Sequence, residues 1–166
     1  SLYAKQNDIP YHELEDINSL ESLNLLRNYA PDYILVSWPK IIKEDVLNVP
    51  KTFCIGTHPT NLPFNRGRHP LHWIIVLSIP ETKLSFFKMD KGIDTGNILL
   101  QVPLTISSDD TINDLNDKMN HAAYEGTKKL CQKFHSYPSY PGVKQNHKQA
   151  NYWRKRTPHD VMIDLR

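Results

Sequence analysis

The stretch Cys54–Gly96 decides the fold, and it reads CIGTHPTNLPFNRGRHPLHWIIVLSIPETKLSFFKMDKGIDTG. Two short apolar runs, 53–55 and 84–87, each lead into a polar loop. The first loop carries His58 and the second carries Asp94. In an open α/β sheet, the loops at strand ends are where ligands bind and catalytic groups lie. The pattern therefore predicts two strands that each deliver one ionisable residue to a shared site.

The rest of the chain alternates expected helices with expected strands. Helices are predicted over 20–28, 70–77 and 111–135, and strands over 33–37, 53–55, 83–88 and 98–102. Ser19 is available to cap the first helix and Pro31 to stop it. Asp109 or Asp110 is expected to cap the long third helix. This order predicts an α/β fold with a Rossmann-like, mostly parallel sheet flanked by helices.

Length and composition are those of one ordinary domain. The chain has 166 residues, and its 20 basic and 18 acidic residues leave a net charge of +2, so no nucleic-acid footprint stands out. The basic run 153–156 is either a solvated tail or a phosphate-binding element. Cys54 and Cys131 lie far apart and are interpreted as buried thiols in a reducing compartment. Without a membrane-length apolar stretch or a signal segment, we expect a cytoplasmic protein that does not contact membranes.

The order of motifs resembles a known family. The string His58-Pro59-Thr60-Asn61-Leu62-Pro63, then Arg66-Gly67, Pro70 and Trp73, then Asp90-Lys91-Gly92-Ile93-Asp94-Thr95-Gly96, resembles the folate-dependent formyltransferases. That family includes the glycinamide ribonucleotide, methionyl-tRNA and nucleotide-sugar N-formyltransferases. The resemblance runs from about residue 32 to 102 and more loosely to the end. The sequences of 67–73 and 151–158 are most similar to the nucleotide-sugar (amino-sugar) branch.

The resemblance implies 10-formyltetrahydrofolate as the formyl donor, held between two loops. One cofactor wall would comprise Pro39, Lys40, Ile41 and Ile42, and the other Met89, Asp90, Lys91, Gly92 and Ile93. The alternative for the first loop is that Trp38 and Ile41 simply pack under the sheet.

The acceptor side is less defined by the sequence. The residues expected to bind the acceptor are Arg66, Arg68, His69, His72 and Trp73. His69 and His72 stand three positions apart and either line the acceptor pocket or lie on the surface. No carboxylate or thiolate stands at a spacing that would complete a metal site with them, so no metal is expected.

Formyl transfer to an amine must stabilise an oxyanion and remove a proton from the attacking nitrogen. A protonated imidazole suits the first task and a carboxylate the second, which makes His58 and Asp94 the expected catalytic residues. Taken singly, His58 has an alternative interpretation as a satisfied strand-end histidine and Asp94 as a turn aspartate. Their order within the family motifs favours catalysis.

The chain departs from the family pattern at Gly56, where the family has an asparagine whose amide joins the oxyanion site. Asn61, Asn65, the Thr57 hydroxyl or a main-chain N–H are the expected substitutes. If nothing substitutes, the loss of one such donor slows catalysis by about 10²–10³.

The family's opening strand and glycine-bearing loop, and its C-terminal subdomain, are not found here. We expect a partial catalytic core over 1–137, followed over 138–166 by a connector and the start of a C-terminal segment.

These observations together predict an N-formyltransferase that moves a formyl group from 10-formyltetrahydrofolate to the amine of a nucleotide-linked amino sugar used in surface glycans. Methionyl-tRNA or glycinamide ribonucleotide is the alternative acceptor. A non-catalytic module that binds folate or a nucleotide sugar is the alternative from another class, and homo-oligomerisation is left open.

Overall fold

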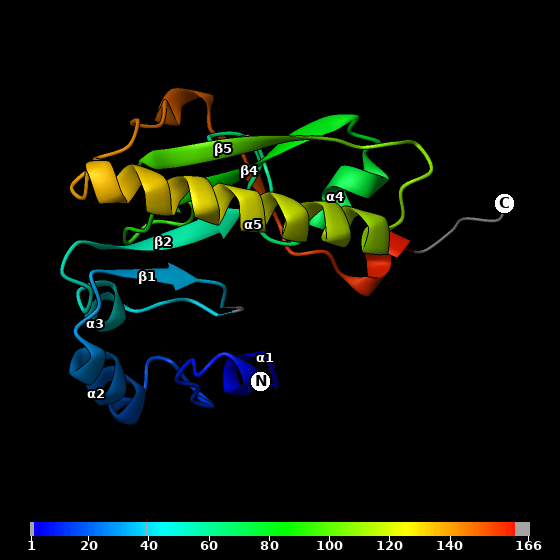
Figure 1. Cartoon of the computed structure of the whole chain (residues 1–166). Helices are drawn as coiled ribbons and strands as arrows, with labels where there is room; N and C mark the ends of the chain where they lie inside the picture. Colours follow the sequence, from blue (N-terminus) through cyan, green and yellow to red (C-terminus); the bar gives the residue numbers. More distant parts are fainter. Residues whose placement is uncertain (1, 39, 162–166) are drawn as a thin grey trace, which may run out of the picture.

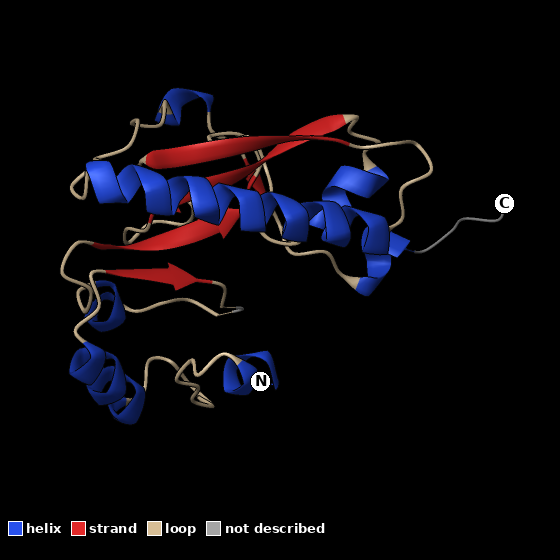
Figure 2. Ribbon diagram, in the orientation of Figure 1, coloured by secondary structure: helices blue, strands red, loops and turns tan. Residues whose placement is uncertain are grey.

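The computed structural model describes residues 2–38 and 40–161. A four-stranded sheet has the order β1-β2-β4-β5, formed by β1 (Tyr33–Val36), β2 (Phe53–His58), β4 (Glu81–Lys88) and β5 (Ile98–Thr105). A small second sheet pairs β3 (Arg66–Gly67) with β6 (Tyr152–Trp153). The helices are α1 (Leu2–Gln6), α2 (Leu20–Tyr29), α3 (Glu44–Leu47), α4 (Pro70–Val76) and α5 (Ile112–Ser136), with 3-10 turns η1 (His147–Gln149) and η2 (Pro158–Val161). The α/β class that the sequence predicts is confirmed, with helices flanking the sheet (Figures 1 and 2).

Strand direction changes within the main sheet. β1 and β2 pair in parallel, as do β3 and β6. β4 pairs antiparallel with β2, and β5 pairs antiparallel with β4. The β4–β5 direction follows from their connection, because a short loop over 89–97 returns the chain beside the strand it has just left. The parallel arrangement expected from the sequence thus applies to the β1–β2 part of the main sheet.

α5 covers one face of the sheet (Figure 1). Its apolar side, including Leu115, Met119 and Leu130, packs on Phe53 and Phe86 in the larger of two core clusters. Gly126 lets α5 approach closely, because a Cβ there would lie 2.3 Å from the ring of Phe86. The long helix that the sequence predicts is therefore the main support of the sheet.

The cap of α5 differs from the expectation. Thr111, not Asp109 or Asp110, is the N-cap, because its hydroxyl and the Asp114 carboxylate form a reciprocal capping box with each other's backbone N–H. Asp110 instead accepts from the N–H of Ser107 at 2.8 Å and pairs with Lys118. For α2, Ser19 caps the helix as predicted, accepting from the N–H of Ser22 at 3.1 Å.

The opposite face of the sheet carries a smaller core. Leu23 of α2 and Val46 of α3 pack on Val36 and Cys54 there, with Met89 at its edge. Because side chains alternate along a strand, Cys54, Gly56 and His58 of β2 all point to this face, away from α5. This face carries the candidate catalytic residues.

β2 is longer than the predicted strand over 53–55. It continues through Thr57 to His58, because all four residues from Ile55 to His58 pair with β4. His58 is thus the last residue of the strand, and the polar loop begins at Pro59.

The segment expected to be a connector is paired with the rest of the fold. Val143 forms a bridge with Ile98 at the start of β5. Tyr152 and Trp153 pair with Arg66 and Gly67. The chain therefore returns after α5 to the loop that follows β2.

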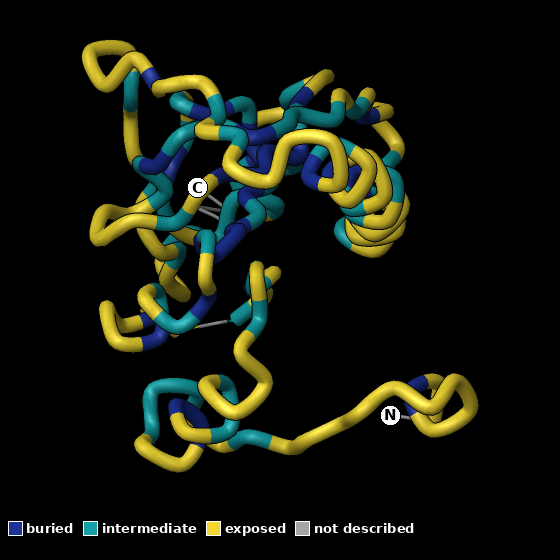
Figure 3. Tube along the Cα trace, turned by 60° about the vertical axis from the view of Figure 1, so that its left-hand side comes forward, coloured by how far each residue is buried: buried dark blue, intermediate teal, exposed yellow. Residues whose placement is uncertain are grey.

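The first residues are the most exposed part of the described chain. Between α1 and α2 the tube is exposed over most of its length and lies apart from the buried core in Figure 3. Within 2–38 and 40–161, no helix combines the length and the apolar character needed to cross a membrane.

Candidate active site

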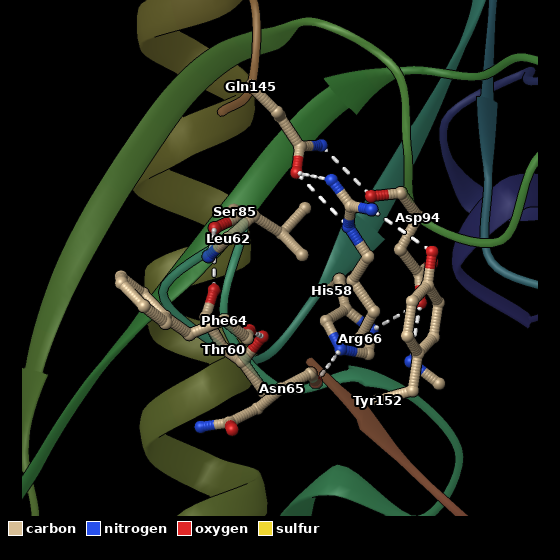
Figure 4. Close-up of polar contacts among 11 residues, drawn as sticks. His58, Thr60, Leu62, Phe64, Asn65, Arg66, Ser85, Asp94, Gln145 and Tyr152 are labelled. Carbon is tan, nitrogen blue, oxygen red and sulfur yellow. Dashed lines mark hydrogen bonds and ion pairs between the residues drawn. The ribbon is translucent and has the colours of Figure 1, made fainter. Parts of the chain in front are cut away.

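His58 and Asp94 meet at one point of the structure. The Nδ1 atom of His58 lies 3.5 Å from the Oδ2 atom of Asp94, and the His58 ring is almost fully buried (Figure 4). The same Oδ2 accepts the backbone N–H of Gly67 at 2.9 Å. A separation of 3.5 Å is loose for a hydrogen bond, and such contacts tighten in substrate complexes. The structure thus brings together the two residues that the sequence predicts to be catalytic.

The route by which they meet differs from the prediction. Parallel strands would bring both loops to the same sheet edge, but β2 and β4 are antiparallel, so His58 lies across from Ser85 and the end of β4 lies across from Ile55. Asp94 reaches His58 because the loop over 89–97 is anchored at Gly67 through the carboxylate itself. The pair depends on this loop, not on strand direction.

The second ring nitrogen of His58 is also engaged. Nε2 lies 2.9 Å from the main-chain oxygen of Asn65, and a carbonyl only accepts, so Nε2 carries the hydrogen. Nδ1 faces a carboxylate, which also only accepts when ionised. Each nitrogen of the His58 ring therefore faces an acceptor oxygen.

The expected substitutes for the missing asparagine divide into two groups. Asn65 points its side chain away from His58 in Figure 4, where its amide oxygen accepts from Asn151 at 2.8 Å. Among the described residues, Thr57 and Asn61 form no side-chain hydrogen bond. Asn65 therefore supports the site through its main chain, Asn61 keeps a donor available, and Thr57 points to the α5 face of the sheet, away from His58.

The loop after His58 is held in place by hydrogen bonds to side chains of β4 and β5. The buried Ser85 hydroxyl donates to Thr60 O at 2.6 Å and accepts from Leu62 N at 3.3 Å. Gln101 donates to Ser85 Oγ at 2.9 Å and to Leu62 O at 3.1 Å. Thr60 in turn donates to Phe64 O at 2.8 Å. These bonds hold the loop as a rigid element, which is what precise placement of His58 needs.

Arg66 does not lie where an acceptor substrate would reach it. Its side chain is 1% exposed, and its guanidinium donates to Gln145, Tyr152 and His147. The prediction that Arg66 binds substrate is corrected by this burial: the residue faces the interior of the loop cluster.

The two loops expected to hold the folate lie side by side. Lys91 pairs with Glu44 at 2.9 Å, which ties the 90–94 loop to the start of α3. Ile42 and Met89 pack in the same cluster, next to Trp38. Lys40 and Asp90 are exposed, as is Ile41, at 78%. Of the remaining expected cofactor residues, Gly92 and Ile93 are exposed, and Pro39 lies outside the described residues.

A buried indole N–H tests whether these residues fit a pterin. The indole nitrogen Nε1 of Trp38 is buried, and it has no hydrogen-bond partner among the described residues. A buried unpaired donor is costly, and a bound group with acceptor atoms would satisfy it. A pterin carries such acceptors, so the residues fit the donor that the sequence implies.

Gly56 is tightly enclosed. A Cβ built on it would lie 2.7 Å from Cζ of Phe87 and 3.1 Å from Cγ of Met89. Phe87 pairs with Gly56 across the strands and points to the same face. The space that an asparagine would need at this position is filled by the Phe87 ring.

The predicted acceptor residues gather with the C-terminal basic run. The guanidinium carbons of Arg154 and Arg156 lie 5.3 and 5.2 Å from the ring centre of Trp73, and Trp73 donates to the Arg154 carbonyl at 2.9 Å. Burial, followed by the positive charges of His72, Lys155, Arg68 and Arg156, lowers the pKa of His69. We call the following six residues the basic cluster: Arg68, His69, His72, Arg154, Lys155 and Arg156.

Other features of the described chain lie apart from this site. A cavity of about 660 Å³ lies between β5 and α5, lined by residues such as Val102 and Ala122. It is on the α5 side of the sheet, whereas His58 points to the other face. Residues 2–38 and 40–161 contain no group of three or more His, Cys, Asp or Glu residues that could hold a metal ion.

Several residues that support the site were missed by sequence reasoning. Gln145 donates to the main chain on both sides of Thr95, at Asp94 O and Gly96 O. Ser85 and Gln101 hold the loop after β2. A single polar residue in a strand or a polar segment has no distinguishing local pattern, and only the fold brings these residues to the site.

Comparison with known proteins identifies the family. Residues 4–130 match the family model described as formyl transferase, so the chain belongs to that family. It is 33% identical over 152 residues to a methionyl-tRNA formyltransferase of Desulforamulus reducens, covering 90% of this chain and 47% of that protein. It is 32% identical over 164 residues to one of Kosmotoga olearia, covering 96% of this chain and 51% of that protein. The chain thus spans about half the length of the curated relatives it matches.

Solved structures show the same fold. The methionyl-tRNA formyltransferase from Clostridium thermocellum superposes with a TM-score of 0.65 at 26% identity, covering 99% of this chain and 69% of that one. An N-formyltransferase from Helicobacter canadensis, in complex with folinic acid and dTDP-3-aminofucose, superposes with a TM-score of 0.69 at 24% identity. That alignment covers 93% of this chain and 53% of the other.

Proposed function

We propose that this chain carries the catalytic core of an N-formyltransferase that uses 10-formyltetrahydrofolate as the formyl donor. The observation that carries the proposal is the buried His58–Asp94 pair, 3.5 Å apart, beside the two loops expected to hold the folate. Membership of the formyl transferase family supports the same reaction class.

The two residues divide the chemistry. The donor, when bound, supplies a formyl group on nitrogen. The acceptor amine forms a new C–N bond to the formyl carbon and the donor's own C–N bond breaks. Each ring nitrogen of His58 already faces an acceptor, so on substrate binding Nε2 exchanges the Asn65 carbonyl for the formyl oxygen. It donates a hydrogen bond there as negative charge develops, an interaction whose removal costs about 2.7–4 kcal/mol in comparable sites. Asp94 keeps the imidazole charged and relays the proton lost by the amine to the leaving nitrogen.

The loops at the pterin end have separate parts. Ile42 and Met89 provide an apolar floor, and Trp38 presents its indole N–H to an acceptor atom. The exposed residues Lys40, Ile41, Asp90, Lys91, Gly92 and Ile93 would form the mouth. The Lys91–Glu44 ion pair holds this mouth together from outside.

The acceptor has two candidates, each favoured by an observation. A nucleotide-linked amino sugar is favoured by the sequences of 67–73 and 151–158, and by the fold shared with the formyltransferase that binds dTDP-3-aminofucose. Methionyl-tRNA is favoured by the names of the curated relatives. Both acceptors carry phosphates, and the basic cluster lies beside α4 to receive them.

The test is a formyl-transfer assay with 10-formyltetrahydrofolate and a panel of acceptors: nucleotide-linked amino sugars, glycinamide ribonucleotide and charged methionyl-tRNA. We expect turnover with one class, and loss of it in His58→Asn and Asp94→Asn. The matched controls are His121→Asn and Asp109→Asn, both exposed and on the α5 side of the molecule.

Two results contradict the proposal. Turnover retained in both His58→Asn and Asp94→Asn would remove the catalytic assignment. Saturable binding of 5-formyltetrahydrofolate without transfer to any acceptor would support the non-catalytic binding module in place of the enzyme.

A further inference from the structure

The guanidinium of Arg66 is buried without an acidic partner. The described ion pairs do not include Arg66. Its N–H groups donate to neutral acceptors: Nη2 and Nε to Oε1 of Gln145 at 2.7 and 3.3 Å, Nη1 to the Tyr152 hydroxyl at 3.0 Å, and Nη2 to Nδ1 of His147 at 3.2 Å. A buried cation is tolerated only when hydrogen-bonded, so each neighbour must present a lone pair to it.

This requirement sets the orientation of the Gln145 amide. Gln145 is 4% exposed, and its oxygen faces the guanidinium. Its nitrogen must then face the other way, where it donates to Asp94 O at 2.9 Å and Gly96 O at 2.7 Å. The flipped amide would set N–H groups against a cation and an oxygen against two carbonyls. Arg66 therefore acts as an orienting charge for Gln145 (Figure 4).

The carbonyls that Gln145 holds belong to the loop that carries Asp94. Asp94 has a left-handed backbone, with φ of 55°, which a non-glycine residue adopts only when its surroundings hold it there. Gly96 is pressed against β4, where a Cβ would lie 1.7 Å from Lys88 O. Gly67, the neighbour of Arg66 in the chain, donates its N–H to the Asp94 carboxylate. The dipeptide Arg66-Gly67 thus acts on Asp94 twice: Arg66 acts on its main chain through Gln145, and Gly67 binds its side chain.

We propose that Gln145 is a positioning residue for formyl transfer: its amide, oriented by the buried Arg66, holds the 94–96 main chain so that the Asp94 carboxylate faces His58. This inference rests on the proposed function, in which the His58–Asp94 pair performs the chemistry. It assigns a role in the site to a segment after α5 that touches neither reacting group.

The first test compares Gln145→Met with Gln145→Glu. The methionine removes all four hydrogen bonds of the amide, whereas the glutamate keeps an acceptor for Arg66 and removes the two bonds donated to the loop. Gln145→Glu turns an oxygen toward Asp94 O and Gly96 O, which displaces the loop, but it keeps a partner for the buried Arg66, so it is the variant in which the rest of the fold is expected to survive. Because a small misplacement of a catalytic group costs about 10²-fold, we expect both variants to lose about that factor in kcat with little change in the KM of the formyl donor. The control is Gln149→Glu, an exposed glutamine of η1, which should retain parental kcat.

A double-mutant cycle separates positioning from general destabilisation. If Gln145 acts through Asp94, Gln145→Glu should cause no further loss of kcat in an Asp94→Asn background. A full additional loss in that background would overturn the proposal. Parental kcat in Gln145→Glu would overturn it as well.

A readout without turnover keeps the inference distinct from the proposed function. In ¹⁵N-histidine-labelled protein, the ring signals of His58 are assigned from their absence in His58→Asn. We expect Gln145→Glu and Asp94→Asn to shift these signals in the same sense, and Gln149→Glu to leave them unchanged. If the parent proves inactive with every acceptor, the proposed function fails. An unshifted His58 in Gln145→Glu, with a clear shift in Asp94→Asn, overturns the positioning role itself.

Discussion

Phe87 stands across from Gly56 in the β2–β4 pair, and its ring occupies the space that a side chain at position 56 would need. The resemblance described in the sequence analysis implies an asparagine at this position, on the face that also carries His58. The Phe87 ring can occupy this space because position 56 has no side chain.

Restoring the asparagine alone should therefore be harmful. Gly56→Asn forces atoms into contacts now at 2.7–3.1 Å, and overpacking of this kind costs about 1–3 kcal/mol. We expect a lower unfolding midpoint in urea for Gly56→Asn than for the parent, and a smaller loss from the same substitution in a Phe87→Ala background, where the ring is absent. Phe87→Ala alone is the control for the cavity. If Gly56→Asn is as stable as the parent, the ring does not limit this position.

The Ser85 hydroxyl should contribute measurably to stability. It is buried and bonds to Thr60, Leu62 and Gln101. Ser85→Ala leaves these groups short of a partner, at a cost of about 1–3 kcal/mol. Chemical denaturation measures the change, and Ser108→Ala, at an exposed position, should stay within about 0.5 kcal/mol of the parent. Equal stability of the two variants would contradict the role of Ser85.

The two cysteines should react at very different rates. Burial raises the pKa of the Cys54 thiol to about 11, so at pH 8 about one molecule in a thousand is thiolate. Cys131 on α5 is exposed, so the prediction that both thiols are buried is wrong for this residue. We expect a thiol reagent to modify one cysteine per native chain and two after unfolding, with Cys131→Ser abolishing the native reaction. Rapid labelling of native Cys131→Ser would show that Cys54 opens to solvent.

His69 should report on acceptor phosphates. Burial and the surrounding positive charges lower its pKa. A bound anion offsets those charges and stabilises the protonated ring, so the pKa of His69 should rise when pyrophosphate binds the basic cluster. NMR titration of the histidine C–H signals measures this, with His121 on α5 as the internal control. An unchanged His69 at saturating pyrophosphate would place the phosphates elsewhere.

Some parts of this architecture could be predicted because their signals are local. α2 and its Ser19 cap follow from a helical period and a capping residue within a few positions. His58 and Asp94 were found because each lies inside a distinctive short motif. The α/β class follows from the alternation of elements, which is also a local property.

Other parts depend on contacts between distant segments. The antiparallel direction of β4 relative to β2 cannot be deduced from the residues of β4, because an apolar strand has the same composition in either direction. Arg66 was expected to face a substrate, since a lone arginine beside a motif looks like a ligand-binding group. Its burial depends on Gln145, which lies 79 positions later in the chain. The Thr111 cap was missed because two aspartates precede it.

The pairing of β3 with β6 bears on how the protein is made. A ribosome releases the chain from its N-terminus, so His58 and Asp94 emerge well before Tyr152 and Gln145. Until those later residues are free to pair with Arg66 and Gly67, the loop that carries Asp94 lacks the two hydrogen bonds from Gln145 to its main chain. A nascent chain that stops after α5 would contain both His58 and Asp94 and still lack the Gln145 contacts to the Asp94 loop, so we expect the site to become fully ordered only after the segment that follows α5 has been synthesised.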